Sequence, residues 1–287
     1  MFNPSLILIE AFIKELCSIY EKMHGENSKD LHLISSSART SLEIIANSDA
    51  PYHDLNHTVM VTLVGTEIIR GKSLLDGYVN SDDWLHFVIS LLNHDIGYVR
   101  GICEGDGDGK YVIDRNQGTI SPPPGSTDAS LTPYHIDRAK LFIEKRYGAN
   151  GRLDVKRICN NIERTRFPVP AEDDTTNSGD YAGLIRAADL IGQLGDPQYH
   201  RKISALYAEF KETGQAEKMG YQSAADLRAG YPKFFWELVS PYISEGIKFL
   251  RRTQTGQVWV QNLYANVFKE EHDTEVYGPE RAGQKIR

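Results

Sequence analysis

The chain has 287 residues, and 32 Lys and Arg residues against 39 Asp and Glu residues give it a formal net charge of −7. This acidic balance argues against a general nucleic-acid-binding protein and against a protein that binds anionic membranes. The three cysteines are widely spaced and fit neither a disulfide framework nor a thiolate zinc site, so we expect a reducing, cytoplasmic setting.

Two amphipathic helices open the chain. The first begins with Asn3-Pro4, a capping residue followed by a proline suited to the first helical position, and ends at Gly25. The second covers residues 29–47. The apolar run at the N-terminus has no basic leader, and no stretch reaches about 18 apolar residues, so we expect neither a signal peptide nor a membrane span.

A pair of histidines begins the next helix. His53 and His57 lie in the segment Tyr52-His53-Asp54-Leu55-Asn56-His57, just before an apolar periodic stretch. Residues four apart at a helix start can share one face, so these two imidazoles can point to the same place.

Ser81, followed by Asp82 and Asp83, is the expected N-cap of the following helix, which is apolar over most of its length. It ends at His94 and Asp95, and Gly97 is expected to be its left-handed cap. A histidine and an aspartate at the end of a buried helix are costly to desolvate unless a partner binds them. A divalent metal ion would serve both.

Residues 98–131 break the helical pattern with repeated glycines and a Pro-Pro-Pro-Gly turn, and a short strand is expected at 110–114. A loop of this length is typically functional or disordered. Because it directly follows His94 and Asp95, we expect it to form a flap over a pocket.

Three further residues that could bind metal come from the next helices. His135 lies in the first turn of a helix that starts at Thr132-Pro133, and Glu163 lies on a helix over 153–165. Asp189 lies in the small, apolar helix Gly183–Gly192, where we expect it to be buried.

The periodic segments amount to about ten helices and no convincing sheet, which predicts a single all-α domain. We divide the chain into N-terminal helices that pack on the core (1–48), the core itself (49–270) and a polar tail expected to be disordered (271–287). Within the core, a long segment over 230–254 should bend at Pro241.

Histidine and carboxylate side chains without a thiolate suit Zn, Mn, Fe or Mg. The candidates are His53, His57, His94, Asp95, His135, Glu163 and Asp189.

This ordered set resembles the metal-dependent phosphohydrolases of the HD superfamily, and over about residues 50–270 the chain is similar to the catalytic domains of cyclic nucleotide phosphodiesterases. Tyr52-His53-x-x-x-His57 is similar to their Tyr-His-Asn-x-x-His motif, with Asp54 in place of Asn. Leu92-Asn-His-Asp95 is similar to their His-Asp motif. Ala187-Ala-Asp-Leu190, followed by Tyr199-His-Arg201, is similar to their Ala-Asp-Leu-Ser motif and the Tyr-Arg after it.

The resemblance implies one or two divalent ions and a small phosphoester substrate, a nucleotide or a phosphodiester like a cyclic nucleotide. His53 would be the general acid that protonates the leaving alkoxide, while a metal-bound hydroxide attacks phosphorus. The first metal would be bound by His57, His94, Asp95 and Asp189, with Asp95 bridging to the second.

The second metal site is where the chain departs from these phosphodiesterases, because Tyr98 stands where they have another histidine. Two-metal HD proteins use two more histidines; His135 could be one, and Glu163 could replace the other. The alternatives are a histidine bonded to its own loop and a surface glutamate paired with a neighbouring arginine.

Two residues could contact the substrate. Arg138, one turn after His135, could bind phosphate or could be solvated. Gln257 resembles the glutamine with which phosphodiesterases hold the purine.

Two other classes of function stay open. Some HD proteins are dinuclear-iron oxygenases, but those sites need a full set of histidines. A non-catalytic module that binds metal or nucleotide is the other alternative, and the complete ligand set argues against it. We expect no nucleic-acid polymer and no membrane as partner, and a homodimer is left open.

Overall fold

Helices make up nearly all of the regular structure in the computed structural model, which describes residues 2–170 and 179–272. The prediction of an all-α fold is confirmed. Most of the predicted polar tail, from residue 273, lies outside the described residues. No described helix combines the length and the apolar character that a membrane span requires.

The elements are α1 (Pro4–His24), α2 (Ser28–Ile45), α3 (Leu55–Asp76), α4 (Ser81–Asn93), α5 (His135–Tyr147), α6 (Val155–Glu163), α7 (Tyr181–Leu194), α8 (Tyr199–Glu212), α9 (Gln215–Lys218), α10 (Ala224–Ala229), α11 (Tyr231–Phe234), α12 (Ser240–Leu250) and α13 (Gln254–His272), with the 3₁₀ turns η1 (Ile96–Tyr98) and η2 (Asp128–Tyr134), the π-helical turn η3 (Phe235–Val239), and the strands β1 (Tyr111–Val112) and β2 (Thr119–Ile120).

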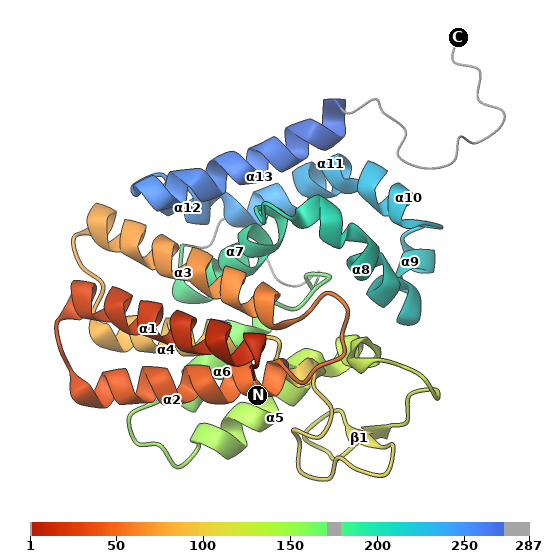
Figure 1. Ribbon diagram of the computed structural model, residues 1–287, viewed down its shortest axis with the longest axis horizontal. Coiled ribbons are helices and arrows are strands. Elements are labelled where there is room, and N and C mark those ends of the chain that lie inside the picture. The colour runs from red at the N-terminus through yellow and green to blue at the C-terminus, as the bar shows by residue number, and fades with distance from the viewer. Residues whose placement is uncertain (1, 171–178, 273–287) are drawn as a thin grey trace.

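Helices α3 and α7 pack against each other at the centre of the molecule, with α4 and α12 also in contact with both (Figure 1). A glycine permits this close approach, because a Cβ on Gly192 of α7 would lie 2.7 Å from the Cα of Val61 on α3. The contact brings the start of α3 beside the middle of α7, where two of the candidate ligands lie.

Helix α1 packs on α2, and α2 packs on α4 at this centre. Ile34, Ala38 and Leu42 of α2 are fully buried. The Ser41 hydroxyl also donates a hydrogen bond of 2.8 Å to the Asn93 side chain, which is the last residue of α4. This hydrogen bond fixes the end of α4 against α2.

Both ends of α4 differ in detail from the prediction. Its N-cap is Asn80, whose side chain accepts from the Asp83 amide at 2.7 Å, rather than Ser81. Gly97 is not a left-handed cap, since its φ is not positive. It is needed for a close contact instead, because a Cβ there would lie 1.8 Å from the carbonyl oxygen of His135.

The segment 98–131 is a long loop that contains the small antiparallel ribbon β1–β2. Its anchor is a buried ion pair in which the Arg138 guanidinium donates to both carboxylate oxygens of Asp106, at 3.2 and 2.9 Å. Asp106 in turn accepts from the backbone amides of Gly101, Cys103 and Val112. Arg138 thus holds the glycine-rich segment 98–131 against α5 through Asp106.

In the segment predicted to bend at Pro241, the π-helical turn η3 ends at Val239, and this proline lies in the first turn of α12. Proline lacks an N–H group and its ring clashes with the carbonyl four residues earlier, so a regular α-helix cannot continue through it.

Candidate metal centre

Four side chains from three helices meet at one point. His57 is in the first turn of α3, His94 and Asp95 directly follow α4, and Asp189 is on α7. Asp95 Oδ2 lies 3.1 Å from the Nε2 atoms of both histidines. Asp189 Oδ1 lies 3.5 Å from the Nε2 of His57 and 3.6 Å from that of His94.

Local hydrogen bonds fix the two imidazoles in this orientation. Asp54 is the N-cap of α3 and accepts from the His57 amide at 2.9 Å, which sets where the helix begins. His94 Nδ1 lies 2.7 Å from the Leu91 carbonyl oxygen and donates to it. The Nε2 of His94 is therefore the nitrogen with a free lone pair, and it faces the carboxylates.

Three of the converging atoms are buried and have no hydrogen-bond partner: His57 Nε2, His94 Nε2 and Asp95 Oδ2. Buried polar atoms in proteins are almost always satisfied, so three unsatisfied atoms at one point call for a ligand between them. The ligand atoms of His57, His94 and Asp189 all lie within 4.8 Å of one another. Two imidazoles and two carboxylates fit a divalent cation such as Zn, Mn or Fe.

The electrostatics of the cluster also favour a positive charge at this point. Burial lowers the pKa of the His57 imidazole, but the carboxylates of Asp189 and Asp95 outweigh burial and raise it to about 9. Burial raises the pKa of the Asp189 carboxyl, but His57 and His94 reduce it to about 2. The cluster thus retains protons where a cation could bind instead.

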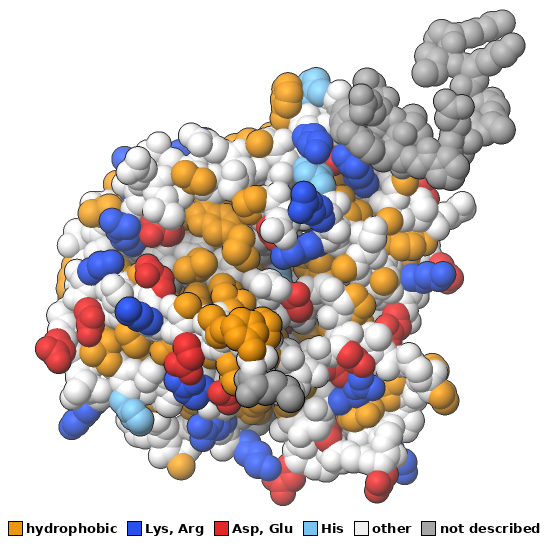
Figure 2. Space-filling model, viewed as in Figure 1, with side chains coloured by type: hydrophobic (Ala, Val, Ile, Leu, Met, Phe, Trp, Pro, Cys, Tyr) orange, Lys and Arg blue, Asp and Glu red, His pale blue; other side chains and the backbone are white. Residues whose placement is uncertain are grey.

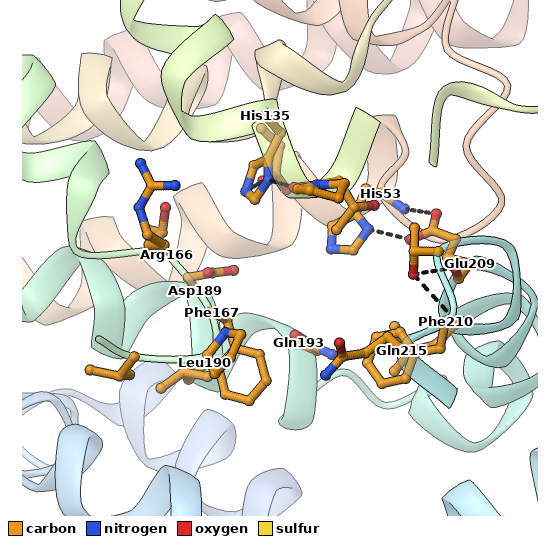
Figure 3. A pocket seen from close by; sticks show the side chains of 18 of the residues that line it. His53, His135, Arg166, Phe167, Asp189, Leu190, Gln193, Glu209, Phe210 and Gln215 are labelled. Carbon is orange, nitrogen blue, oxygen red and sulfur yellow. Dashed lines mark hydrogen bonds and ion pairs between the residues drawn. The ribbon is translucent and has the colours of Figure 1, made fainter. Parts of the chain in front are cut away.

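His53 lies beside this cluster and forms a pair with Glu209 of α8, 2.5 Å from its Nδ1 to the carboxylate (Figure 3). The other oxygen of Glu209 accepts from the backbone amides of Tyr52 and His53, at 2.7 and 3.1 Å. Burial lowers the pKa of His53, but the charge and the hydrogen bond of Glu209, together with the charge of Asp95, raise it above its ordinary value. The imidazole is held in position and is favoured in its protonated form.

Tyr98 lies between His53 and His135. Its ring stacks on His53 with a centroid distance of 4.5 Å and an angle of 13°, and on His135 at 4.5 Å and 29°. The Nδ1 of His135 lies 2.6 Å from the Thr132 carbonyl oxygen, and its Nε2 lies 3.9 Å from Asp95 Oδ1. The three rings form a continuous stack along one wall.

A cavity of about 380 Å³ opens from the cluster. Asp95, Asp189 and His53 line it, whereas His57 and His94 lie behind the carboxylates. The amides of Gln193 and Gln215 lie across the cavity from His53 and His135 (Figure 3).

Apolar walls complete the cavity. They come from Phe167, Phe210 and Phe234. On the outer surface of the molecule, apolar side chains also lie among charged ones (Figure 2). A volume of this size suits a small molecule and is too small for a folded polymer.

A family model matches residues 2–273. The chain belongs to the Npun_R2479-like family. No match was found among curated proteins. The family description specifies no activity, and nothing in it links these proteins to the HD phosphohydrolases, so that resemblance stays a prediction.

The Npun_R2479-like fold brings six of the nine predicted site residues together: His53, His57, His94, Asp95, His135 and Asp189. The other three lie elsewhere.

Arg138 is fully buried, and its guanidinium donates to the carbonyls of Gly97, Val99 and Val112 as well as to Asp106. It is neither solvated nor directed at the cavity, so we correct its predicted role to that of an anchor for the segment 98–131.

Glu163 and Gln257 are also turned away from the cluster. Glu163 is ion-paired with Lys140 and Arg166, and it is not part of either group of potential metal ligands among the described residues. This matches the alternative of a surface glutamate paired with an arginine. Gln257 is exposed on α13, and its amide donates to the Arg251 carbonyl at 3.2 Å. The purine-binding role is therefore corrected as well.

The predicted flap is not found over the cavity either, since no residue of 99–131 lines it. The buried pair of Asp106 and Arg138 holds this segment against α5. The cavity is bordered instead by residues 164–169, by α7 and by α8.

Three residues of the site were missed. Glu209 had a detectable signal, because it continues the buried face of Tyr199, Ile203 and Leu206 on α8, where a carboxylate needs a partner. Gln193 lies one turn after Asp189 on α7, but no local pattern indicates that a glutamine faces a cavity. Gln215 follows a glycine in a polar linker and carries no such signal.

Proposed function

We propose that this chain hydrolyses a small phosphoester, preferably a nucleotide-like phosphodiester, as an HD-type phosphohydrolase. The observation that carries the proposal is the set of three buried, unpartnered atoms of His57, His94 and Asp95, next to a cavity that Asp95 lines. The order and spacing of the sequence motifs that contain these residues support it.

His57, His94, Asp95 and Asp189 would bind a divalent ion. Such an ion would polarise a phosphoryl oxygen and lower the pKa of a bound water, which provides a nucleophile at neutral pH.

His53 has the position and the chemistry of a general acid. It lines the cavity next to Asp95, and Glu209 holds its ring through Nδ1, which leaves Nε2 for the substrate. The raised pKa keeps the imidazolium available near neutral pH. We infer that His53 gives its proton to the leaving oxygen while Glu209 stabilises the charged ring.

The remainder of the substrate would occupy the cavity beyond the carboxylates. The apolar walls provide surface for a flat or apolar group, and the amides of Gln193 and Gln215 form no hydrogen bond with any described residue. An amide offers both a donor and an acceptor, so these two side chains can orient an uncharged polar group.

Hydrolysis is favoured over oxygen activation by the ligand set. The oxygenase alternative needs a full set of histidines around a second ion, and Glu163 is engaged by Lys140 and Arg166.

The test is a panel of phosphomonoesters and phosphodiesters, assayed with metal-free protein before and after addition of Zn, Mn, Fe(II) or Mg. We expect release of the alcohol from at least one diester only after metal is added. Oxygen consumption by the Fe(II) form without hydrolysis of any ester would overturn the proposal in favour of an oxygenase. Bound metal with neither hydrolysis nor oxygen consumption would overturn it in favour of a non-catalytic binding module.

A further inference from the structure

The two oxygens of the Asp95 carboxylate have different surroundings. Oδ2 lies between the Nε2 atoms of His57 and His94, at 3.1 Å from each. Oδ1 lies 3.9 Å from the Nε2 of His135. A second ion bridged by Asp95 would have to bind on the Oδ1 side.

The ring of Tyr98 occupies that wall. It is 2% exposed and stacks on His135 and on His53, with 4.5 Å between ring centroids on either side. Because the phenol ring lies between the two imidazoles, they cannot bind the same ion. Tyr98 therefore removes one possible ligand pair from the Oδ1 side.

Other ligands for a second ion are already engaged. Glu163 pairs with Lys140 and Arg166. The second group of potential ligands in the described part of the chain, His53, His57 and Asp95, shares His57 with the first group. The unpartnered nitrogen of His57 is Nε2, and one imidazole nitrogen binds one ion. The two groups of ligands therefore cannot each bind an ion at the same time.

On the Oδ1 side, a second ion would keep only Asp95 and His135 as ligands from the described residues. Catalytic zinc sites typically have three protein ligands. The charge of the cluster also favours a single ion. The carboxylates of Asp95 and Asp189 neutralise one divalent ion, and a second divalent ion would leave an uncompensated buried charge.

We propose that this centre binds one divalent ion tightly, and that the Tyr98 ring excludes a second. The inference rests on the proposed function for the first ion and goes beyond it in fixing the number of ions. Tyr98 is a positioning residue in this account, because the same ring that blocks the second site also supports the plane of His53.

The experiment measures metal bound per chain. Metal-free full-length protein is titrated with Zn against a chromophoric chelator, and the retained metal is measured by elemental analysis after dialysis. We expect one ion in the wild type and in the matched control Tyr98→Phe, which keeps the ring. His135→Ala should also retain one ion, because His135 is not a ligand of that ion.

Tyr98→His should take up a second ion with weaker affinity, because a smaller ring with a ligating nitrogen would join Asp95 Oδ1 and His135. Tyr98→Ala is the second variant, in case the first does not fold, and circular dichroism checks both. Two ions in the wild type, falling to one in His135→Ala, would overturn the inference. A single ion in both folded variants would show that the ring is not what excludes the second.

These outcomes are separate from failure of the proposed function. No ion in the wild type, or a tightly bound ion retained by His57→Ala, would remove the metal centre itself. A count of two with His57→Ala empty would leave the proposed function in place and overturn only the single-ion inference.

Discussion

At the scale of single residues, the site separates two histidines that lie four positions apart in sequence. The Nε2 of His57 is unpartnered and directed at the carboxylates, whereas His53 is paired through Nδ1 with Glu209 and lines the cavity. His57 thus has the surroundings of a ligand and His53 those of a proton donor.

This separation predicts different effects of two alanine substitutions. His53→Ala should keep its metal and lose kcat by about 10²–10⁴-fold on an alkyl phosphodiester, the usual effect of removing a general acid. The loss should be much smaller on a p-nitrophenyl ester, whose leaving group needs no proton. The measurement is kcat on both esters together with metal content.

His57→Ala is the comparison, and it should lose metal and activity on both esters. Equal losses on the two esters for His53→Ala, or loss of its metal, would show that His53 is not the acid.

Glu209 leads to a prediction about pH. Burial lowers the pKa of His53 and the Glu209 carboxylate raises it, with a net upward shift. Removing that charge should lower the pKa of His53, so the acid loses its proton at a lower pH. In Glu209→Gln, the alkaline fall in kcat should therefore move to lower pH. Gln keeps an oxygen for the Tyr52 and His53 amides, and a lower rate with an unshifted profile would mean that Glu209 is only structural.

The motif residues were predictable because sequence order and spacing mark them. For Glu209 the sequence indicates a buried carboxylate on α8, but not its partner, because His53 lies 156 residues away and only tertiary packing joins them. The substrate role of Arg138 rested on its spacing from His135, which does not show which helix face borders a cavity. The role of Gln257 rested on a short local resemblance, which does not fix its place in the fold.

At the scale of elements, the junction of α4, η1 and α5 sets the geometry of the Tyr98 wall. Gly97 contacts the backbone of His135 so closely that a Cβ would lie 1.8 Å from the carbonyl oxygen and 2.7 Å from the Ala139 amide nitrogen. Both atoms belong to the backbone of α5, so a Cβ at position 97 would force the backbone of one of the two segments to move.

Gly97→Ala should therefore destabilise the protein by about 1–3 kcal/mol, the usual cost of overpacking. Chemical denaturation measures this effect. Gly107→Ala in the 98–131 segment is the control, since a Cβ there meets no atom within 4 Å. Equal stability of the two variants would contradict the close contact.

The segment 98–131 now has a structural role that can be tested by pH. Burial raises the pKa of Asp106, but the hydrogen bonds from Arg138, Val112 and Cys103 and the charge of Arg138 together bring it below its ordinary value. A carboxyl with a lowered pKa stabilises the fold above its unfolded value of about 3.9, and this contribution is lost as the pH falls through the folded value.

Asp106→Asn should reduce the free energy of unfolding by about 3–5 kcal/mol at pH 7, because it leaves Arg138 buried without a counter-charge. The difference from the wild type should narrow below pH about 4. Urea unfolding of the variant and the wild type at pH 7 and below pH about 4 measures this difference in stability. A difference that does not change with pH would contradict the ion pair. Since no residue of 99–131 lines the cavity, the substrate profile of a folded variant should not change.

At the scale of the whole molecule, helical periodicity was enough to predict the fold class and most helices. It could not predict the cavity, which forms where α7, α8 and residues 164–169 come together. That packing depends on contacts such as Gly192 against Val61, which no local pattern reveals. The sequence predicted the residues of the cluster, but not the shape of the cavity beside them.

The central claim is that one buried cluster holds the ion on which hydrolysis depends. The most direct test is to titrate metal-free protein with the most active metal while the hydrolysis of one diester and the bound metal are measured in the same samples. The rate should rise in proportion to bound ion and level off when the site is full. Asp189→Asn should bind no ion and show no activity, and the surface control Asp76→Asn should match the wild type. Full activity in the metal-free protein or in Asp189→Asn would contradict the account.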